Sequence, residues 1–285
     1  MPSPLPPGSF AAPFDGDLGD DLAFALKLAD AADAASMARF DAPDLDVQTK
    51  TDASPVTEAD LATERAIREL IEAERPDDGV FGEEFGATSS TGSADRQWVI
   101  DPIDGTANYL KGIPMWSTLI ALSIDGVPRV GVVSQPAIGR RWWAASGLDA
   151  WTNTTDGAER RISVSGIDSI DAASVSFQSI GQWRGAGELD ALERLTAAVW
   201  RDRGYGDAWP YMLLAEGRLE LVAEFDVKEY DVAAHVPIIT EAGGRFTSYS
   251  GADSISERSS LATNGILHEA FLALLHSPAT PEPLR

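Results

Sequence analysis

The sequence predicts a layered α/β fold, in which amphipathic helices alternate with short strands. Three observations support this prediction. Two segments near the start, 18–40 and 57–74, repeat apolar residues at helical spacing. After residue 76 the pattern changes to short apolar runs of β-type composition, bounded by turn residues. Helical patterns return after residue 187 and alternate with further strands, so helices and mixed sheets are expected to form separate layers.

Local composition predicts each remaining element in order. In the first half, strands are expected over 80–81, 97–100, 117–124, 130–134 and 141–145, with Asp125-Gly126 turning the third into the fourth as a hairpin. In the second half, strands are expected at 162–164, 173–177, 219–225 and 261–263, and helices at 187–200, 208–216, 231–242 and 266–275. Pro237 lies inside one expected helix and should bend it, because proline removes a backbone hydrogen bond.

Length and composition limit the domain organisation. The chain has 285 residues, of which 44% are apolar and 24% charged, which is typical of one large or two tightly packed globular domains. We expect a disordered Pro-rich tail over 1–17, an N-terminal α+β half over 18–150 and a C-terminal α/β half over 151–280. No repeat or flexible linker separates the halves, so they should pack against each other.

Charge and cysteine content exclude several functions. Forty-five acidic residues against 22 basic ones give a net charge of −23, which argues against nucleic-acid and membrane-surface partners. With no cysteine there is neither a thiolate nucleophile nor a cysteine metal site, and the three histidines lack zinc-binding spacing. The start of the chain shows no signal peptide and no run of 18 apolar residues occurs. We therefore expect a cytoplasmic protein that binds metal ions or small molecules.

The strongest chemical signal is the segment 98–106, Trp-Val-Ile-Asp-Pro-Ile-Asp-Gly-Thr. A buried strand should end at Asp101, and Asp104 can cap a short helix whose free N–H groups begin at Gly105 and Thr106. Two carboxylates beside a helix N-terminus suit a phosphate that is bridged to a divalent metal. Taken singly, Asp104 could be only a helix cap and Asp101 only a turn residue.

Two further acidic segments are weak signals by themselves. Gly82-Glu83-Glu84 follows a short apolar run, and its alternative is a solvated acidic loop. Asp231-Val232-Ala233-Ala234 opens an expected helix, which Asp231 could simply cap.

Together the three segments resemble the inositol monophosphatase family of metal-dependent, lithium-sensitive phosphatases. They occur in the family's order and at its separations, and the string at 101–106 is highly specific to it. The similarity runs from about residue 20 to 275. It implies a five-layered αβαβα sandwich, a site in the cleft between the two halves and, usually, a homodimer. Suggestive strings point to the bacterial histidinol-phosphatase branch: Gly126-Val127-Pro128, Gly131-Val132-Val133, Arg140–Ala145 and Tyr205-Gly206-Asp207.

The resemblance implies a cluster of Mg²⁺ ions, with Mn²⁺ as a possible substitute. Glu83, Asp101 and the main-chain carbonyl of Ile103 would hold one ion, and Asp101, Asp104 and Asp231 a second, with Asp101 bridging. A third, weaker ion is implied near Glu83. Two ions roughly 3.5–4 Å apart can polarise a phosphoryl group and generate hydroxide at neutral pH. The N-terminal half would supply most ligands and the C-terminal half Asp231 and the substrate contacts.

The resemblance also assigns catalytic and substrate-binding roles. Thr106 and Asp60, together with Glu83, would orient and deprotonate the attacking water. The alternative for Asp60 is a capping box with Thr57 at a helix start. The implied substrate contacts are Asp104, Gly105, Thr106, Asp207, Glu224 and Asp231. For two of these, alternatives without a role in binding remain: Asp207 could cap a helix and Glu224 could be a solvated acid at a strand end.

One departure from the family pattern is Tyr230, which stands where the family usually has tryptophan and which can fill the same aromatic position. His235, in the following helix, is expected to be a packing or surface residue.

The implied function is Mg²⁺-dependent hydrolysis of L-histidinol phosphate in histidine biosynthesis. Its alternative within the same class is a phosphatase for inositol 1-phosphate or a related sugar or nucleotide phosphate, because fold and metal site would be shared. A non-catalytic acidic binding protein is the alternative from another class. It would tolerate the loss of Asp60 or Thr106, yet both residues are present.

Overall fold

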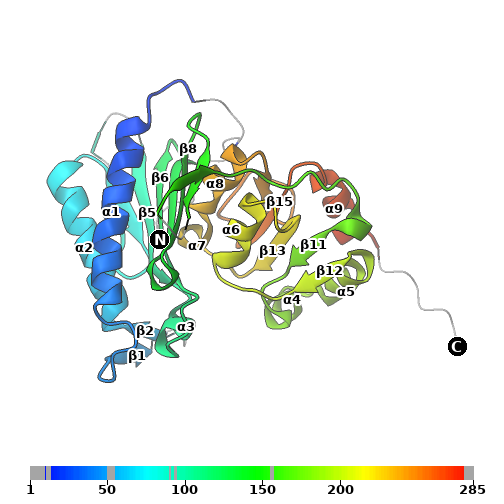
Figure 1. Ribbon diagram of the computed structural model, residues 1–285, viewed down its shortest axis with the longest axis horizontal. Helices are drawn as coiled ribbons and strands as arrows, with labels where there is room; N and C mark the ends of the chain where they lie inside the picture. The colour runs from blue at the N-terminus through cyan, green and yellow to red at the C-terminus, as the bar shows by residue number, and fades with distance from the viewer. Residues whose placement is uncertain are drawn as a thin grey trace, which may run out of the picture.

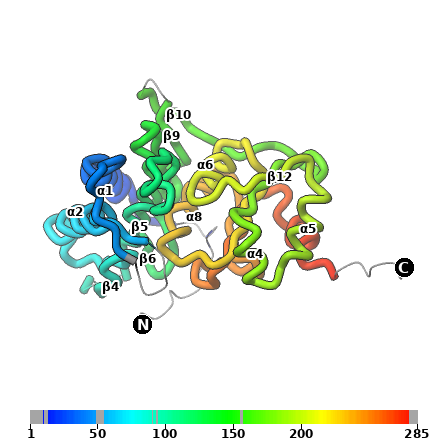
Figure 2. Tube along the Cα trace, turned by 90° about the horizontal axis from the view of Figure 1, so that it is seen from below, coloured from blue at the N-terminus to red at the C-terminus, as the bar shows by residue number. Residues whose placement is uncertain are grey.

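The protein is a sandwich of five layers in the order helix, sheet, helix, sheet, helix (Figure 1). This computed structural model describes residues 10, 14–49, 55–89, 91–92, 95–154 and 157–278. Figure 2, seen from below, shows α1 and α2 at one end of the same stack and α5 at the other. The αβαβα sandwich with mixed sheets that the sequence predicts is therefore confirmed.

The first two layers are a helix pair and a large mixed sheet. Helices α1 (Gly19–Met37) and α2 (Glu58–Glu74) pack on one face of the sheet. The order of its eight strands is β10 (Glu159–Arg161), β9 (Ala150–Asn153), β8 (Arg140–Ala145), β7 (Val127–Gln135), β6 (Ser117–Ile124), β5 (Arg96–Asp104), β3 (Gly79–Gly82) and β4 (Gly86–Thr88). Among the described strands of this large sheet, β3 and β5 are the one parallel pair. A separate ribbon of β1 (Val47–Thr49) and β2 (Pro55–Thr57) leads into α2.

The other three layers form the second half. Helices α6 (Trp209–Ala215), α7 (Glu229–Val232) and α8 (His235–Glu241) lie between the sheets. The small sheet has the order β12 (Arg201–Arg203), β11 (Ser174–Ser176), β13 (Leu221–Phe225), β15 (Ser259–Thr263) and β14 (Arg245–Thr247). Its outer face is covered by α4 (Ile180–Ala186), α5 (Leu189–Ala198) and α9 (His268–Leu275), and the short α3 (Thr106–Leu110) follows β5.

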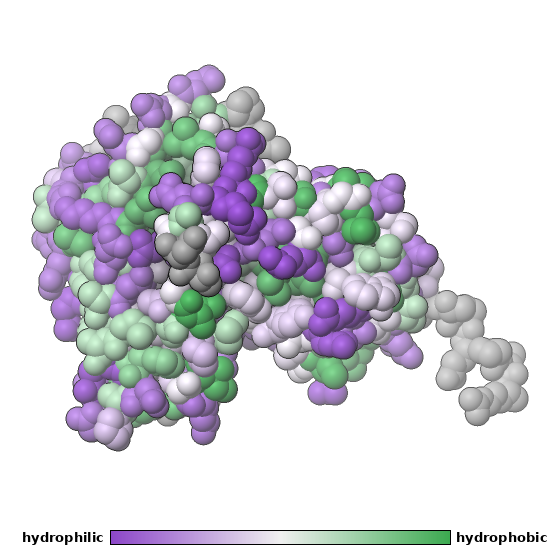
Figure 3. Space-filling model, in the orientation of Figure 1, coloured by the Kyte–Doolittle hydropathy of each residue, from purple (hydrophilic) through white to green (hydrophobic). Residues whose placement is uncertain are grey.

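Apolar clusters fill the spaces between the layers. Trp98 lies in the cluster under α1 and α2, Trp142 in the one between the sheets, and Trp183 in the one beneath the outer helices. All three indoles are completely buried. Across the described ranges no helix is both long and apolar enough to cross a membrane. On the face in Figure 3, hydrophilic residues are spread over both halves.

Two expected elements differ in the structure. The helix expected over 231–242 is two helices, because α7 ends at Val232 and α8 begins at His235. Pro237 is the third residue of α8, and the break at residues 233 and 234 lies three to four positions before it, where a proline removes the backbone hydrogen bond of a continuous helix. The strand expected at 162–164 is absent, and the preceding residues form β10 instead.

The expected limits of the two halves also shift. The large sheet continues to Arg161, so the chain leaves it later than the expected boundary at 150. Within the expected tail over 1–17, Phe10 is buried with its ring 6.1 Å from Phe246, and the Arg129 guanidinium lies over Phe14. Residues 1–9 and 11–13 lie outside the described ranges. At Phe10 and Phe14 the expectation of an undocked tail was wrong, because aromatic rings can dock without any helical or strand periodicity.

Candidate active site

The end of β5 brings two of the predicted acids to one place. Asp101 is buried and its Oδ1 accepts a hydrogen bond from the Ile103 N–H at 3.1 Å. The register of β5 against β6 shifts between Asp101 and Asp104. Residues three apart on a regular strand point to opposite faces, and such an irregularity re-aims side chains. Asp101 therefore feels the negative charge of Asp104 directly.

Asp104 does not cap the short helix that follows it, contrary to our expectation. Helix α3 has Gly105 as its N-cap and no side-chain cap. The Asp104 Oδ2 instead accepts from the Ala208 N–H at 2.6 Å, at the start of α6 in the other half. Gly105 makes this turn with a φ of 88°, and a Cβ there would lie 3.1 Å from Oδ2 of Asp207. Glycine thus permits both the backbone conformation and the close approach of the two halves.

Asp60 forms the capping box and also reaches the predicted site. Its Oδ2 accepts from the Thr57 N–H at 2.8 Å and from the Thr57 hydroxyl at 2.6 Å, which caps α2. Its Oδ1 accepts from the Thr106 hydroxyl at 3.3 Å. The Thr106 hydroxyl also lies 3.1 Å from the Ile103 carbonyl oxygen. The two readings of Asp60 are therefore compatible, because each uses a different carboxylate oxygen.

An aromatic contact joins the segments of Glu83 and Asp231. Tyr230 packs against Phe81 of β3 with ring centroids 5.8 Å apart, so tyrosine fills an aromatic position here. Asp231 is the third residue of α7, and its Oδ2 accepts from the Lys228 N–H at 2.7 Å. Burial raises the pKa of Asp231 to about 7, and the charge of Glu83 adds to the rise.

The acids form one strongly repulsive cluster. Burial raises the pKa of Asp101 well above its ordinary value, and the charges of Glu83, Asp104 and Asp231 raise it further. Burial likewise raises the pKa of Asp104, with Asp207 and Asp231 as its main charged neighbours. Such a cluster favours divalent cations, which remove the repulsion and restore ionisation.

The donor set fits Mg²⁺ in its chemistry. Within the described ranges, no three acidic or imidazole side chains are close enough, as they stand, to enclose a metal ion. Asp101, Asp104 and Asp231 each bind a backbone N–H through one oxygen, and the second oxygen has no donor in the described part of the chain. Backbone bonds thus hold each carboxylate while leaving one hard oxygen for a cation, the ligand type that Mg²⁺ prefers.

Glu224 is a buried acid that the C-terminal half contributes near the cluster. It lies on β13 with only 3% of its surface exposed, and its Oε1 has no hydrogen-bond partner among the described residues. Burial raises the pKa of Glu224 well above its ordinary value, as do the charges of Asp207 and Asp231. The alternative that Glu224 is a solvated acid at a strand end is therefore wrong. A buried oxygen without a donor is costly unless a ligand completes it.

Asp207 is held between the two halves. Its Oδ2 accepts from the Asn108 side-chain amide at 2.8 Å, and its N–H donates to the Gln178 side chain at 3.0 Å. Its backbone is left-handed, with a φ of 53°. Asp207 does not cap α6, so that alternative is wrong. Asn108 carried no signal in the sequence, because its contact with Asp207 joins distant segments.

His235 packs in the core between the sheets. Its ring stacks on Tyr211 at a centroid distance of 4.3 Å, and within the described part of the chain neither ring nitrogen meets the distance and angle of a hydrogen bond. Burial lowers the pKa of His235 to about 3. A neutral, unpartnered imidazole of this kind is a packing residue, as the sequence predicts.

Replacing His235 by Phe should weaken the acid sensitivity of the fold. Below pH 6.5 the unfolded chain takes up a proton that the folded ring, with a pKa of about 3, does not bind, so stability is lost as pH falls. Between pH 7 and 5 this side chain should lower the free energy of unfolding by about 2 kcal/mol. Urea denaturation of both proteins at the two pH values measures the difference. Identical pH dependences would contradict the assignment.

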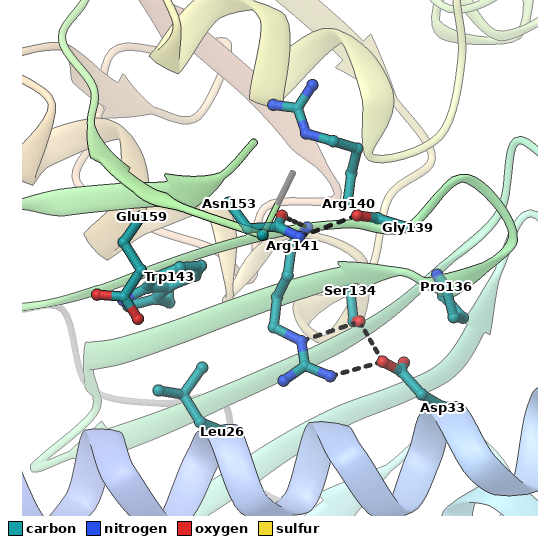
Figure 4. Close-up of a pocket in the computed structure, with 11 residues that line it drawn as sticks. Leu26, Asp33, Ser134, Pro136, Gly139, Arg140, Arg141, Trp143, Asn153 and Glu159 are labelled. Carbon is teal, nitrogen blue, oxygen red and sulfur yellow. Dashed lines mark hydrogen bonds and ion pairs between the residues drawn. The ribbon is translucent and has the colours of Figure 1, made fainter. Parts of the chain in front are cut away.

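Neither of the two cavities described next contains a predicted site residue. One, of about 410 Å³, lies between α1 and strands β7 to β9 (Figure 4). There Arg141 donates to Asp33 Oδ2 at 2.5 Å and to Ser134 Oγ at 3.2 Å, so its charge is largely neutralised. The other, of about 680 Å³, is lined by α4 and by residues 225 and 226, directly after Glu224.

Comparisons with known proteins show the family to which the chain is similar. A model of the inositol monophosphatase family matches residues 17–279. The chain is 48% identical over 259 residues to a histidinol-phosphatase of Mycobacterium tuberculosis, covering 90% of this chain and 98% of the relative. A histidinol-phosphatase of Streptomyces coelicolor is also 48% identical, covering 91% and 98%. An inositol monophosphatase structure from Zymomonas mobilis, 33% identical, matches with a TM-score of 0.78 over 92% of this chain and 100% of that one.

Proposed function

Because the chain belongs to the inositol monophosphatase family and is a phosphatase, we propose that it hydrolyses L-histidinol phosphate to L-histidinol and phosphate. Relatives named histidinol-phosphatase at 48% identity over nearly their whole length support this substrate. The observation that carries the proposal is Glu224, a buried acid near the carboxylate cluster, whose Oε1 accepts no hydrogen bond from any residue that the structure describes. An acid in that position suits a substrate whose alcohol part is cationic.

The proposed cofactor is Mg²⁺, two to three ions per site, with Mn²⁺ as a substitute. Glu83, Asp101, Asp104 and Asp231, with the carbonyl of Ile103, would hold the ions. When bound, the metal ions supply a hydroxide at neutral pH and neutralise charge on the phosphoryl and leaving oxygens. The cluster's raised pKa values support this assignment, because the acids ionise together only beside cations.

The chain's own residues would orient the nucleophile. The Thr106 hydroxyl donates its hydrogen to Asp60 Oδ1, which leaves the Thr106 oxygen to accept a hydrogen from the attacking water. Glu83 would take the proton of that water as general base. The phosphoryl oxygens would lie against the N–H groups of Gly105 and Thr106, with Asp104 and Asp231 beside them.

The alcohol part would face Glu224 and Asp207. Histidinol brings an ammonium group and an imidazole, and a charged hydrogen bond between a carboxylate and a cation is about twice as strong as a neutral one. Inositol offers only neutral hydroxyls. The charges of Asp207 and Asp231 near Glu224 add to the attraction for a cation.

L-Histidinol phosphate should exceed myo-inositol 1-phosphate in kcat/KM by about tenfold or more. Glu224→Gln should lower kcat/KM for histidinol phosphate and leave p-nitrophenyl phosphate, which lacks a cationic group, nearly unchanged. Phosphate release in Mg²⁺ measures both. Equal values for the two natural esters, or a preference for the inositol ester, would favour the inositol-phosphatase alternative and leave the phosphatase itself intact.

The remaining parts of the proposal rest on the family resemblance. We propose a homodimer, a cytoplasmic location and a site shared by the two halves of the chain. Sedimentation equilibrium tests the dimer. A monomer at all protein concentrations would contradict it.

A further inference from the structure

A buried ion pair on α2 stands outside the mechanism described above. Glu64 is completely buried, and its Oε1 accepts from the Arg68 Nε at 2.7 Å, one helical turn further on. Burying a carboxylate is costly unless it is paired and its oxygens are hydrogen-bonded. The other partners of Glu64 therefore show what this carboxylate does.

These partners are the backbone of the turn that follows β3. Glu64 Oε2 accepts from the Glu84 N–H at 2.7 Å, and Oε1 accepts from the Phe85 N–H at 3.2 Å. The Arg68 guanidinium donates to the Gly86 carbonyl. Three successive residues of this turn are thus bound by two side chains of one helix.

The turn begins directly after Glu83, the acid that faces Asp101 across the strands. The Glu83 N–H donates to the Ile100 carbonyl of β5 at 3.2 Å, next to Asp101 in the chain. The charge of Glu83 raises the pKa of Asp101. The backbone of Glu83 is therefore hydrogen-bonded to β5, and the residues that follow Glu83 in the chain are hydrogen-bonded to Glu64.

Close packing makes this arrangement specific. A Cβ at Gly82 would lie 2.0 Å from Glu64 Oε1, so a side chain at this position would clash with the carboxylate. Glycine at the end of β3 therefore allows Glu64 to approach the backbone. Asp60 stands one turn before Glu64 on α2, and residues four apart share a helix face. One face of α2 therefore holds both the Thr106 hydroxyl, through Asp60, and the Glu83 turn, through Glu64.

We propose that Glu64, supported by Arg68, is a positioning residue that holds the Glu83 turn in the geometry that binds metal. Among the hydrogen bonds of the described residues, Glu64 forms none with a proposed ligand side chain, and it acts through the backbone of residues 84–86. This inference rests on the proposed function, in which Glu83 is a metal ligand. Residues that orient ligands in this way typically contribute about 10- to 100-fold to metal affinity.

The test is Mn²⁺ binding to Glu64→Gln, followed by the electron paramagnetic resonance signal of the free ion. Glutamine keeps the shape but presents an amide N–H₂ to donors, so Mn²⁺ should bind about tenfold more weakly. At saturating metal, kcat should return to within about threefold of wild type. The matched control is Glu216→Gln, because Glu216 is a similarly enclosed carboxylate with arginine partners, in the other half. It should lose stability and keep wild-type affinity.

The outcomes separate the two proposals. Weak Mn²⁺ binding by Glu64→Gln and Glu83→Gln, but not by Glu216→Gln, supports the positioning role. Wild-type affinity in Glu64→Gln beside weakened Glu83→Gln overturns it and leaves the metal assignment standing. Wild-type affinity in Glu83→Gln overturns the metal assignment and the positioning role with it. If Glu64→Gln does not fold, Arg68→Met takes its place, with about threefold weaker binding expected and unchanged affinity overturning the role.

Discussion

Replacing Asp101 by Asn is expected to lower kcat/KM by about a thousandfold while the protein stays folded. Asp101 is buried among the charges of Glu83, Asp104 and Asp231, and in the proposed function it would help to hold the cations. Asparagine keeps an oxygen for the Ile103 N–H but has no charge to hold the ions together. Removing one of several repelling charges should also make the metal-free protein at least as stable as wild type.

Two measurements check this expectation. Phosphate release at varied Mg²⁺ gives kcat/KM, and thermal unfolding in excess EDTA gives the stability of the metal-free proteins. Asp33→Asn is the matched control, because burial raises the pKa of Asp33 too, but its partners are Arg141 and Ser134, away from the cluster. It should keep wild-type turnover. Unaltered turnover in Asp101→Asn, or full wild-type activity in excess EDTA, would refute the metal assignment.

Asp60→Asn is expected to lower kcat by about a hundredfold with little change in KM. Asparagine can place its carbonyl oxygen toward the two Thr57 donors, which keeps the cap of α2. Its amide nitrogen then faces the Thr106 hydroxyl and donates where Oδ1 accepted. The hydroxyl turns away from the orientation that the attacking water needs, while phosphate binding is left intact.

The control isolates the capping role of the same carboxylate. Thr57→Ala removes the hydroxyl that caps α2 and should cost about 1 kcal/mol of stability with activity nearly retained. Steady-state kinetics and urea denaturation of both variants separate the two effects. If Asp60→Asn also lost only stability and kept its kcat, Asp60 would be a cap and nothing more.

Local patterns were sufficient for much of the fold. Helices α1 and α2 follow from apolar residues at helical spacing, and the hairpin of β6 and β7 from Asp125-Gly126 between apolar runs. Short elements such as α4 and the edge strand β12 were missed, because pairing and packing with distant segments stabilise them more than their own composition does. The docked Phe10 was missed for the same reason.

The family of the protein was determined by the sequence, because the string at 101–106 with Glu83 and Asp231 indicates one family. Which atoms those acids use was decided only by the tertiary structure. Asp104 binds Ala208 rather than α3, Asp60 divides its two oxygens between a cap and Thr106, and Glu64 reaches the Glu83 turn. Each is a contact between segments far apart in the chain, and a local pattern carries no information about which distant N–H or hydroxyl a carboxylate will meet.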